Sequence, residues 1–288
     1  MFEFSLHAFT WTTRMDNKAL DYLPKLKKMG YCGFEVPLAF QLLDLIDTEY
    51  INKKLYELEM QCVTGTVFPE EFSIISDDEE KWQLGINYLK KCIDLTADMG
   101  AKILSGMLYA PMGLRQRIPR TPIQWERSAK NLKKVARYAA LKDITICMEP
   151  INRYESFFLN IIEDAILLVH EIDEPNVKIN IDTYHMNIEE KNIYNIIVKA
   201  NKLIGHVHCS ENDRGIPGTG HFDWDGFAKG LIDIKYNGLI CIESFFEPIA
   251  EIAEFTPIWR KLAPSVDKLA EDGIIFLKNK INQIESLD

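Results

Sequence analysis

The feature that most constrains the fold is a regular alternation of short apolar segments with longer amphipathic ones. Eight short segments have the apolar character of β-strands: Glu3–His7, Gly33–Val36, Gln61–Thr66, Lys102–Gly106, Ile144–Glu149, Val177–Asp182, Ile204–His208 and Leu239–Glu243. The clearest helical stretches between them are Asn17–Met29, Glu79–Met99, Pro122–Leu141 and Ile188–Asn201. Strict alternation of this kind predicts an α/β fold with a parallel sheet and right-handed crossovers.

The length of the chain favours a closed sheet over an open one. Eight units over 288 residues give 288/8 = 36 residues per unit, which is typical of a (β/α)8 barrel, the TIM barrel. No glycine-rich dinucleotide fingerprint follows the first strand, and no Walker-type phosphate loop occurs. We therefore predict a single TIM barrel domain spanning residues 1–288 rather than a doubly wound nucleotide-binding sheet.

Composition and charge exclude several classes of protein. The 33 Lys and Arg residues against 43 Asp and Glu give a net charge of −10, which argues against a nucleic-acid-binding protein. The six cysteines contain no C-x-x-C pair, so neither a disulfide framework nor a zinc ribbon is indicated. No signal peptide and no apolar run long enough to span a membrane is evident, and we expect a cytoplasmic protein with no membrane partner.

Four consecutive predicted strands end in a polar residue that could bind a metal. These residues are Glu149, Asp182, His208 and Glu243, with spacings of 33, 26 and 35 residues. Catalytic residues of such barrels lie at the carboxyl ends of the strands. Because neighbouring strands end at the same rim, we expect the four side chains to lie side by side.

Three carboxylates and one imidazole form a set of mostly oxygen ligands. Such a set suits Mn²⁺ or Mg²⁺ and tolerates Co²⁺, whereas a structural zinc site would be built from cysteine and histidine. Each residue alone could be an ordinary solvated strand end. Four in register favour a metal site, because clustered carboxylates repel one another unless a cation or a shared proton is present.

A glycine-rich loop, Glu211–His221, follows the seventh predicted strand. Its backbone N–H groups could bind a phosphate group, or the segment could be a long turn. Its acidic residues outnumber its single Arg214, and this favours the turn.

Several motifs around these residues resemble those of one enzyme family. The segment Met148–Glu155 is similar to E-x-x-N-R-[FY]-E, and Asp182–Glu190 nearly matches D-T-F-H-M-N-I-E-E. Gly205–His208, the loop from Arg214 to Gly220, Glu243–Phe245 and the late Trp259–Arg260 pair extend the match. The sequence thus resembles the ketose 3-epimerases, the D-tagatose, D-psicose (allulose) and L-ribulose 3-epimerase group of the xylose-isomerase-like barrel superfamily.

The resemblance implies a metal-dependent epimerase acting on a free ketohexose or ketopentose. It implies Mn²⁺ held by Glu149, Asp182, His208 and Glu243, and the O1–O3 end of the sugar held by Glu155, His185 and Arg214. The configuration at C3 would be inverted through a cis-enediolate, with Glu149 and Glu243 as the acid/base pair on opposite faces of the sugar. The resemblance also implies a homodimer or homotetramer.

The departures from the family pattern lie where the far end of the sugar would bind. His7 and Trp11 are expected to form pocket walls, with His7 in place of a larger aromatic residue. The loop containing Leu108 lacks a tryptophan that many relatives carry, and Gly215 stands where some have a second arginine. Phe245 is expected near the pocket or at an interface. These differences leave the preferred ketose open, and also whether a phosphorylated sugar is accepted.

Three alternatives remain at this point. The same metal site could serve an aldose–ketose isomerase similar to hydroxypyruvate isomerase, or an inosose dehydratase. A DNA-repair enzyme similar to endonuclease IV would need a trinuclear zinc cluster rich in histidine and a basic face, and six histidines with a net charge of −10 argue against it. A non-catalytic sugar-binding barrel would leave the two facing glutamates unexplained.

Overall fold

The structure is a computed structural model that describes residues 2–12, 15–16, 18–113, 118–249, 256 and 258–287. Its strands form a closed barrel in the order β1 to β8, and every neighbouring pair is parallel. The strands are β1 (Glu3–His7), β2 (Gly33–Pro37), β3 (Gln61–Thr66), β4 (Ile103–Gly106), β5 (Thr145–Met148), β6 (Val177–Asp182), β7 (Ile204–Cys209) and β8 (Leu239–Ile242). The α/β barrel predicted from the alternation is confirmed.

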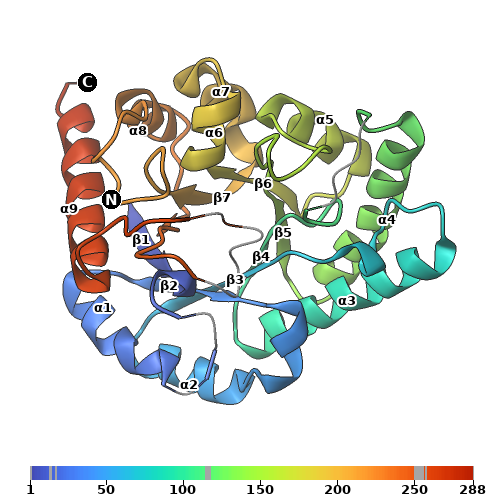
Figure 1. Ribbon diagram of the computed structural model, residues 1–288, viewed down its shortest axis with the longest axis horizontal. Helices are drawn as coiled ribbons and strands as arrows, with labels where there is room; N and C mark the ends of the chain where they lie inside the picture. The colour runs from blue at the N-terminus through green and yellow to red at the C-terminus, as the bar shows by residue number, and fades with distance from the viewer. Residues whose placement is uncertain are drawn as a thin grey trace.

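Helices surround this barrel (Figure 1). They are α1 (Leu23–Met29), α2 (Thr48–Glu57), α3 (Glu79–Asp98), α4 (Pro122–Ala140), α5 (Ile162–Ile172), α6 (Thr183–Glu189), α7 (Ile193–Ala200), α8 (Trp224–Asp233) and α9 (Val266–Glu285). The longer helices bury an apolar stripe; on α3 this stripe includes Ile86, Leu89 and Ile93, which are almost completely buried. Full burial of one such side chain stabilises the fold by about 1.5–3 kcal/mol. In the described part of the chain, no helix has both the length and the hydropathy needed to cross a bilayer.

Two predicted helices differ from the observed ones. The predicted helix Ile188–Asn201 is wrong at its start, because α6 ends at Glu189 and α7 begins only at Ile193. The side chain of Asn192 accepts a hydrogen bond from the N–H of Asn195 and caps α7, so the chain turns where apolar periodicity alone suggested continuity. The observed helix is also shorter than the predicted helix Asn17–Met29, because α1 begins only at Leu23. Asn17 lies outside the described residues.

The strand ends bring the polar residues to one rim of the barrel. β5 ends at Met148 and β8 at Ile242, so Glu149 and Glu243 are the first residues beyond their strands. The pairing of β6 with β7 shifts by one residue at Ile179 and Asn180, and this irregularity aligns Asp182 directly with His208. A local departure from regular pairing therefore sets two of the four predicted metal ligands side by side.

The loop after β7 is organised around the carboxylate of Glu211. This carboxylate accepts hydrogen bonds from the backbone N–H groups of Asn212 (3.1 Å), Gly218 (2.8 Å) and Phe222 (3.0 Å), and from the indole of Trp224 (3.0 Å). The backbone donors that could have bound a phosphate are thus partly occupied by a side chain of the loop itself. This geometry favours the turn over the phosphate-binding alternative.

The protonation state of Glu211 should therefore control the stability of this loop. Burial alone raises the pKa of Glu211, but the four N–H donors outweigh burial and hold the pKa below its usual value. A lowered folded-state pKa adds stability above the unfolded-state pKa, and this stability is lost as the pH falls through the folded-state pKa.

We expect Glu211→Gln to lower the free energy of unfolding by about 2–3 kcal/mol at pH 7, because one set of charge-assisted hydrogen bonds is replaced by neutral ones. The deficit should shrink as the pH falls toward 3, because the carboxyl group of the unfolded chain becomes protonated there while the lowered pKa keeps the folded-state carboxylate charged for longer. Urea denaturation at both pH values measures it. Asp225→Asn is the control, since Asp225 is an exposed carboxylate of α8 paired only with Lys280, and its effect should be small at either pH. An equal deficit for Glu211→Gln at pH 3 and pH 7 would show that the charge of Glu211 does not stabilise the loop.

Candidate functional site

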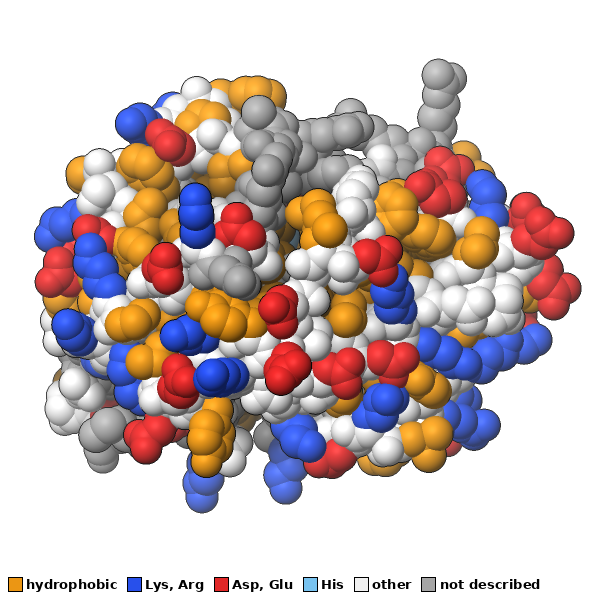
Figure 2. All heavy atoms as spheres, turned by 90° about the horizontal axis from the view of Figure 1, so that it is seen from below, with side chains coloured by type: hydrophobic (Ala, Val, Ile, Leu, Met, Phe, Trp, Pro, Cys, Tyr) orange, Lys and Arg blue, Asp and Glu red, His pale blue; other side chains and the backbone are white. Residues whose placement is uncertain are grey.

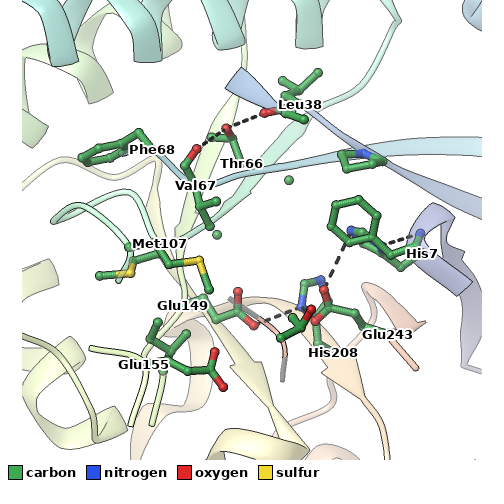
Figure 3. Close-up of a pocket in the computed structure, with 18 of the residues that line it drawn as sticks. His7, Leu38, Thr66, Val67, Phe68, Met107, Glu149, Glu155, His208 and Glu243 are labelled. Atoms are coloured by element: carbon green, nitrogen blue, oxygen red, sulfur yellow. Dashed lines mark hydrogen bonds and ion pairs between the residues drawn. The ribbon is translucent and has the colours of Figure 1, made fainter. Parts of the chain in front are cut away.

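A cavity of about 230 Å³ opens at the carboxyl ends of the strands. Figure 3 shows its two sides. Glu149, Glu155, His208 and Glu243 lie on one side, and Leu38, Val67 and Phe68 lie on the opposite side. The lining also includes the polar residues His7, Glu35, His185 and Arg214 and the apolar residues Met107 and Met112. The cavity can therefore hold a small molecule with its polar end against the strand ends of β5 to β8.

The four predicted metal ligands lie together at the polar side of the cavity. One ligand atom from each of Glu149, Asp182, His208 and Glu243 lies within 4.8 Å of the others. The imidazole is central, because its Nδ1 is 3.1 Å from a carboxylate oxygen of Glu149 and 3.2 Å from one of Glu243. Glu149, Asp182 and His208 are buried and Glu243 is half-buried.

Burial and crowding of like charges set the protonation of this group. Burial raises the pKa of Glu149 and brings that of Asp182 to about 6. Partial burial opposes the charge on Glu243, but its attraction to the imidazole of His208 lowers its pKa to about 2. Burial opposes a charge on His208, yet the surrounding carboxylates, with Glu35 the strongest, raise its pKa well above the usual value. The cluster carries more negative than positive charge in a desolvated place.

The donor set fits a divalent cation. The Oδ2 atom of Asp182 is buried and accepts no hydrogen bond from the described residues, with Nε2 of His185 3.5 Å away, although Oδ1 of the same carboxylate accepts from the N–H of Tyr184. A buried carboxylate oxygen without a donor is costly unless a cation completes its coordination. Three carboxylates and one imidazole are ligands suited to Mn²⁺ or Mg²⁺.

His185, one of the predicted substrate contacts, presents a defined hydrogen-bond donor. Its Nδ1 lies 3.1 Å from the backbone N–H of Asn152, which can only donate, so Nδ1 must be the acceptor. Burial lowers the pKa of His185 and favours the neutral ring. The proton therefore resides on Nε2, which lies 3.5 Å from Asp182 and beside the cavity.

Arg214 and Glu155, two more predicted contacts, form a buried ion pair at the same wall. One guanidinium nitrogen of Arg214 is 3.2 Å from both carboxylate oxygens of Glu155, and Arg214 Nε has no hydrogen-bond partner. The guanidinium lies over the ring of Tyr184 at 4.1 Å and faces Phe245 at 5.4 Å. Arg214 also has a φ of +65°, a left-handed conformation that the Glu211 loop maintains.

The remaining predicted pocket residues divide into two groups. His7 and Phe245 line the cavity, and Nε2 of His7 is 3.9 Å from Glu243. Trp11 and Leu108 are not among the described residues that line it, which corrects both assignments. The indole of Trp11 stacks on Phe34 and Tyr22 and donates to the carbonyl of Ala19.

Leu108 is completely buried, and the neighbouring Met107 faces the cavity in its place. The chain leaves β4 at Gly106, whose φ of +118° is a backbone conformation that favours glycine. A Cβ at Gly106 would lie 2.1 Å from the carbonyl oxygen of Thr66, so this turn requires glycine.

Sequence reasoning missed Glu35 and His206 as parts of the site. Glu35 is completely buried and lies 2.8 Å from Nε2 of His206 and 3.0 Å from Nε2 of His208. The available signal was a charged residue in the middle of an apolar strand. Burial opposes its charge, but the two imidazoles hold the pKa of Glu35 well below its usual value.

Comparisons with known proteins agree with this geometry. Residues 23–279 match the family described as Xylose isomerase-like TIM barrel. A protein of Synechocystis sp., named "Probable ketose 3-epimerase", is 30% identical over 276 residues, with 96% of each chain covered. The chain belongs to the ketose 3-epimerases of the xylose isomerase-like TIM barrel family. As a member of this family it is an isomerase-class enzyme.

Solved structures give the same family relationship. The structure of an L-ribulose 3-epimerase superposes with a TM-score of 0.94 at 28% identity, covering 100% of this chain and 97% of that one. A D-allulose 3-epimerase from Methylomonas sp., in complex with D-allulose, gives 0.91 at 28% identity, with 97% of each chain covered. The resemblance inferred from the motifs is confirmed at the level of the family.

We expect the cluster to bind Mn²⁺ directly. Addition of Mn²⁺ to EDTA-treated protein should raise its melting temperature, because a cation bound only by the folded state stabilises it by about 2.7 kcal/mol at 100 times Kd. Differential scanning calorimetry measures the shift.

Asp182→Asn should remove most of this Mn²⁺-dependent shift, because it neutralises the carboxylate whose Oδ2 lacks a donor. Asp143→Asn is the matched control, because Asp143 is an exposed residue preceding β5, at the other end of that strand, and pairs only with Lys102. An equal Mn²⁺ shift in wild type and Asp182→Asn would contradict the assignment.

Proposed function

We propose that the protein is a single-domain, metal-dependent ketose 3-epimerase that acts on free ketoses and uses Mn²⁺, with Mg²⁺ or Co²⁺ as substitutes. One observation carries the proposal: Glu149 and Glu243 lie on either side of the same imidazole nitrogen, at the polar side of a cavity of sugar size. A cytoplasmic homodimer or homotetramer remains the prediction from the sequence.

Glu149, Asp182, His208 and Glu243 would hold the metal ion. When bound, a divalent cation supplies Lewis-acid polarisation of the substrate oxygens next to C3, which makes the C3 proton acidic enough to remove. The unpartnered oxygen of Asp182 and the crowding of three carboxylates support this assignment.

Glu149 and Glu243 would perform the proton transfers. Inversion at C3 requires one group to remove the proton from one face of the sugar and another to return a proton to the opposite face. Their carboxylates extend from the ends of β5 and β8, strands separated by β6 and β7, so a substrate over His208 would lie between them. One carboxylate acts as base and the other as acid, and the roles exchange in the reverse direction.

His185 and Arg214 would stabilise the cis-enediolate between the two proton transfers. The Nε2–H of His185 and the unpartnered Nε of Arg214 are preorganised donors in a desolvated site, where such groups act most strongly on developing negative charge. Glu155 fixes the guanidinium and can accept from a sugar hydroxyl. These roles explain why the three residues share one wall of the cavity.

The charge around the cavity favours a neutral sugar over a sugar phosphate. Among the described residues that line it, four are glutamates and the cation is Arg214, which already pairs with Glu155. The backbone donors of the neighbouring loop are partly taken by Glu211. Acidic and basic side chains are also interspersed over the face shown in Figure 2, unlike the basic face that a DNA-repair enzyme needs.

Incubation with D-fructose in deuterated water tests the reaction. The Mn²⁺-loaded enzyme should introduce deuterium at C3 and form the C3 epimer, and EDTA should abolish both until Mn²⁺ is restored. Mass spectrometry and NMR of the recovered sugars give the position of the label. Label at C1 alone would indicate aldose–ketose isomerisation instead, and full activity in metal-free protein would contradict the metal dependence.

The Glu243→Gln variant tests the acid/base pair. We expect kcat to fall by roughly 10²–10⁴-fold, because an amide cannot exchange the C3 proton. Glu247→Gln serves as the control, since Glu247 lies four residues along the chain and pairs with Lys261 on the surface. Retention of more than a tenth of the wild-type kcat in Glu243→Gln would show that Glu243 does not act in the acid/base pair.

A further inference from the structure

A second group of titratable residues lies directly beneath the candidate metal ligands. Glu35 extends from β2 across the barrel interior to His206 and His208 of β7, although β1 and β8 separate these two strands around the barrel. All three side chains are almost fully buried. Burying a carboxylate this completely costs free energy unless the carboxylate is paired and hydrogen-bonded. The cluster of Glu35, His206 and His208 therefore requires a physical explanation.

The arrangement indicates which nitrogen of His208 keeps its proton when the other nitrogen binds a cation. Both carboxylate oxygens of Glu35 lie within hydrogen-bond distance of His208 Nε2, at 3.1 and 3.0 Å. An ionised carboxylate only accepts hydrogen bonds, so Nε2 must be the donor. Nδ1 faces the carboxylates of Glu149 and Glu243 at 3.1 and 3.2 Å, so in the charged ring it carries a proton of its own, which it would give up to bind a cation while Nε2 keeps its proton.

We propose that Glu35 is a positioning residue of the metal centre: it holds His208 in the Nε2–H tautomer and aims Nδ1 at the cation. A carboxylate behind a ligating imidazole also makes its other nitrogen a stronger electron donor. The inference deepens the proposed function and rests on it, because it concerns the affinity of the same metal site.

The surrounding residues hold Glu35 in this place. His206 donates to it from Nε2 at 2.8 Å, and this second hydrogen bond fixes the rotation of the carboxylate. On β3, Gly65 leaves room for it: a Cβ there would lie 2.8 Å from Oε1 of Glu35. Gly65 on one side and the buried His206 on the other thus hold the carboxylate of Glu35 against His208.

A second metal ion is the competing explanation. Glu35, His206, His208 and Cys241 each offer an atom within 4.8 Å of the others, as a metal site would require. The direct hydrogen bonds of 2.8–3.1 Å between Glu35 and the two imidazoles account for the cluster without an ion. The number of ions bound per chain separates the two explanations.

Isothermal titration of EDTA-treated, dialysed full-length protein with Mn²⁺ tests the proposal. Wild type should bind one Mn²⁺ per chain, and Glu35→Gln should bind one with a Kd raised at least tenfold, since loss of such a partner costs roughly 10–100-fold in affinity. Thr64→Val is the matched control: Thr64 is a fully buried polar residue of β3 that bonds to Thr96, away from the imidazoles. Its Kd should equal that of wild type.

Each outcome decides the question. An unchanged Kd in a folded Glu35→Gln variant, or two Mn²⁺ ions per wild-type chain, would overturn the positioning role and leave the proposed function intact. Absence of Mn²⁺ binding in wild type would overturn the proposed function itself.

A measurement on wild type keeps the test decisive if Glu35→Gln fails to fold. ¹⁵N NMR spectra of the Mg²⁺-loaded protein report which ring nitrogen of each histidine carries a proton. The ring signals of His206 and His208 are distinguished by comparison with the His206→Asn variant. We expect the proton of His208 on Nε2. A proton on Nδ1 of His208 would overturn the proposal.

Discussion

Three carboxylates that surround one buried imidazole impose a constraint that the rest of the structure must satisfy. Ions removed from water lose several kcal/mol of hydration each, and like charges in a desolvated place repel strongly. His208 offsets part of this charge because it lies between Glu149 and Glu243, but one oxygen of Asp182 accepts no hydrogen bond from the described residues. A divalent cation would neutralise the remaining negative charge of the cluster. Binding of the metal would therefore also stabilise the fold at this rim of the barrel.

The barrel makes this arrangement possible because its interior is closed on all sides. A carboxylate from β2 can reach β7 only inside a closed sheet, where side chains from opposite strands meet. At the rim, the irregular pairing of β6 and β7 aligns Asp182 with His208, and the loop held by Glu211 carries Arg214 to the cavity. Rigid strands thus hold the metal ligands and a hydrogen-bonded loop holds a substrate contact, the division of labour that precise catalytic geometry requires.

The sequence predicted the parts of the site that follow from periodicity. A repeat of about 36 residues defined the barrel, and residues at equivalent strand ends fall together once the barrel closes. Positions in the loops beyond the strand ends were less predictable: Met107 lines the cavity, whereas its neighbour Leu108 is completely buried and is not among the described lining residues. Glu35 escaped notice because strands of a parallel barrel are buried on both faces, so the apolar character of its neighbours dominated the pattern. Its role depends on a partner 173 residues away, which no local pattern encodes.

We propose that His208 coordinates the metal through Nδ1 while Glu35 accepts a hydrogen bond from its other nitrogen. Electron spin echo envelope modulation of the Mn²⁺-loaded protein tests this most directly, because it detects nitrogen nuclei bound to the ion. We expect ¹⁴N modulation from a single imidazole in unlabelled protein, its replacement by ¹⁵N modulation when histidine carries ¹⁵N at Nδ1 alone, and its loss in His208→Gln. Absence of ¹⁴N modulation in wild type, or signals from two imidazoles, would contradict it.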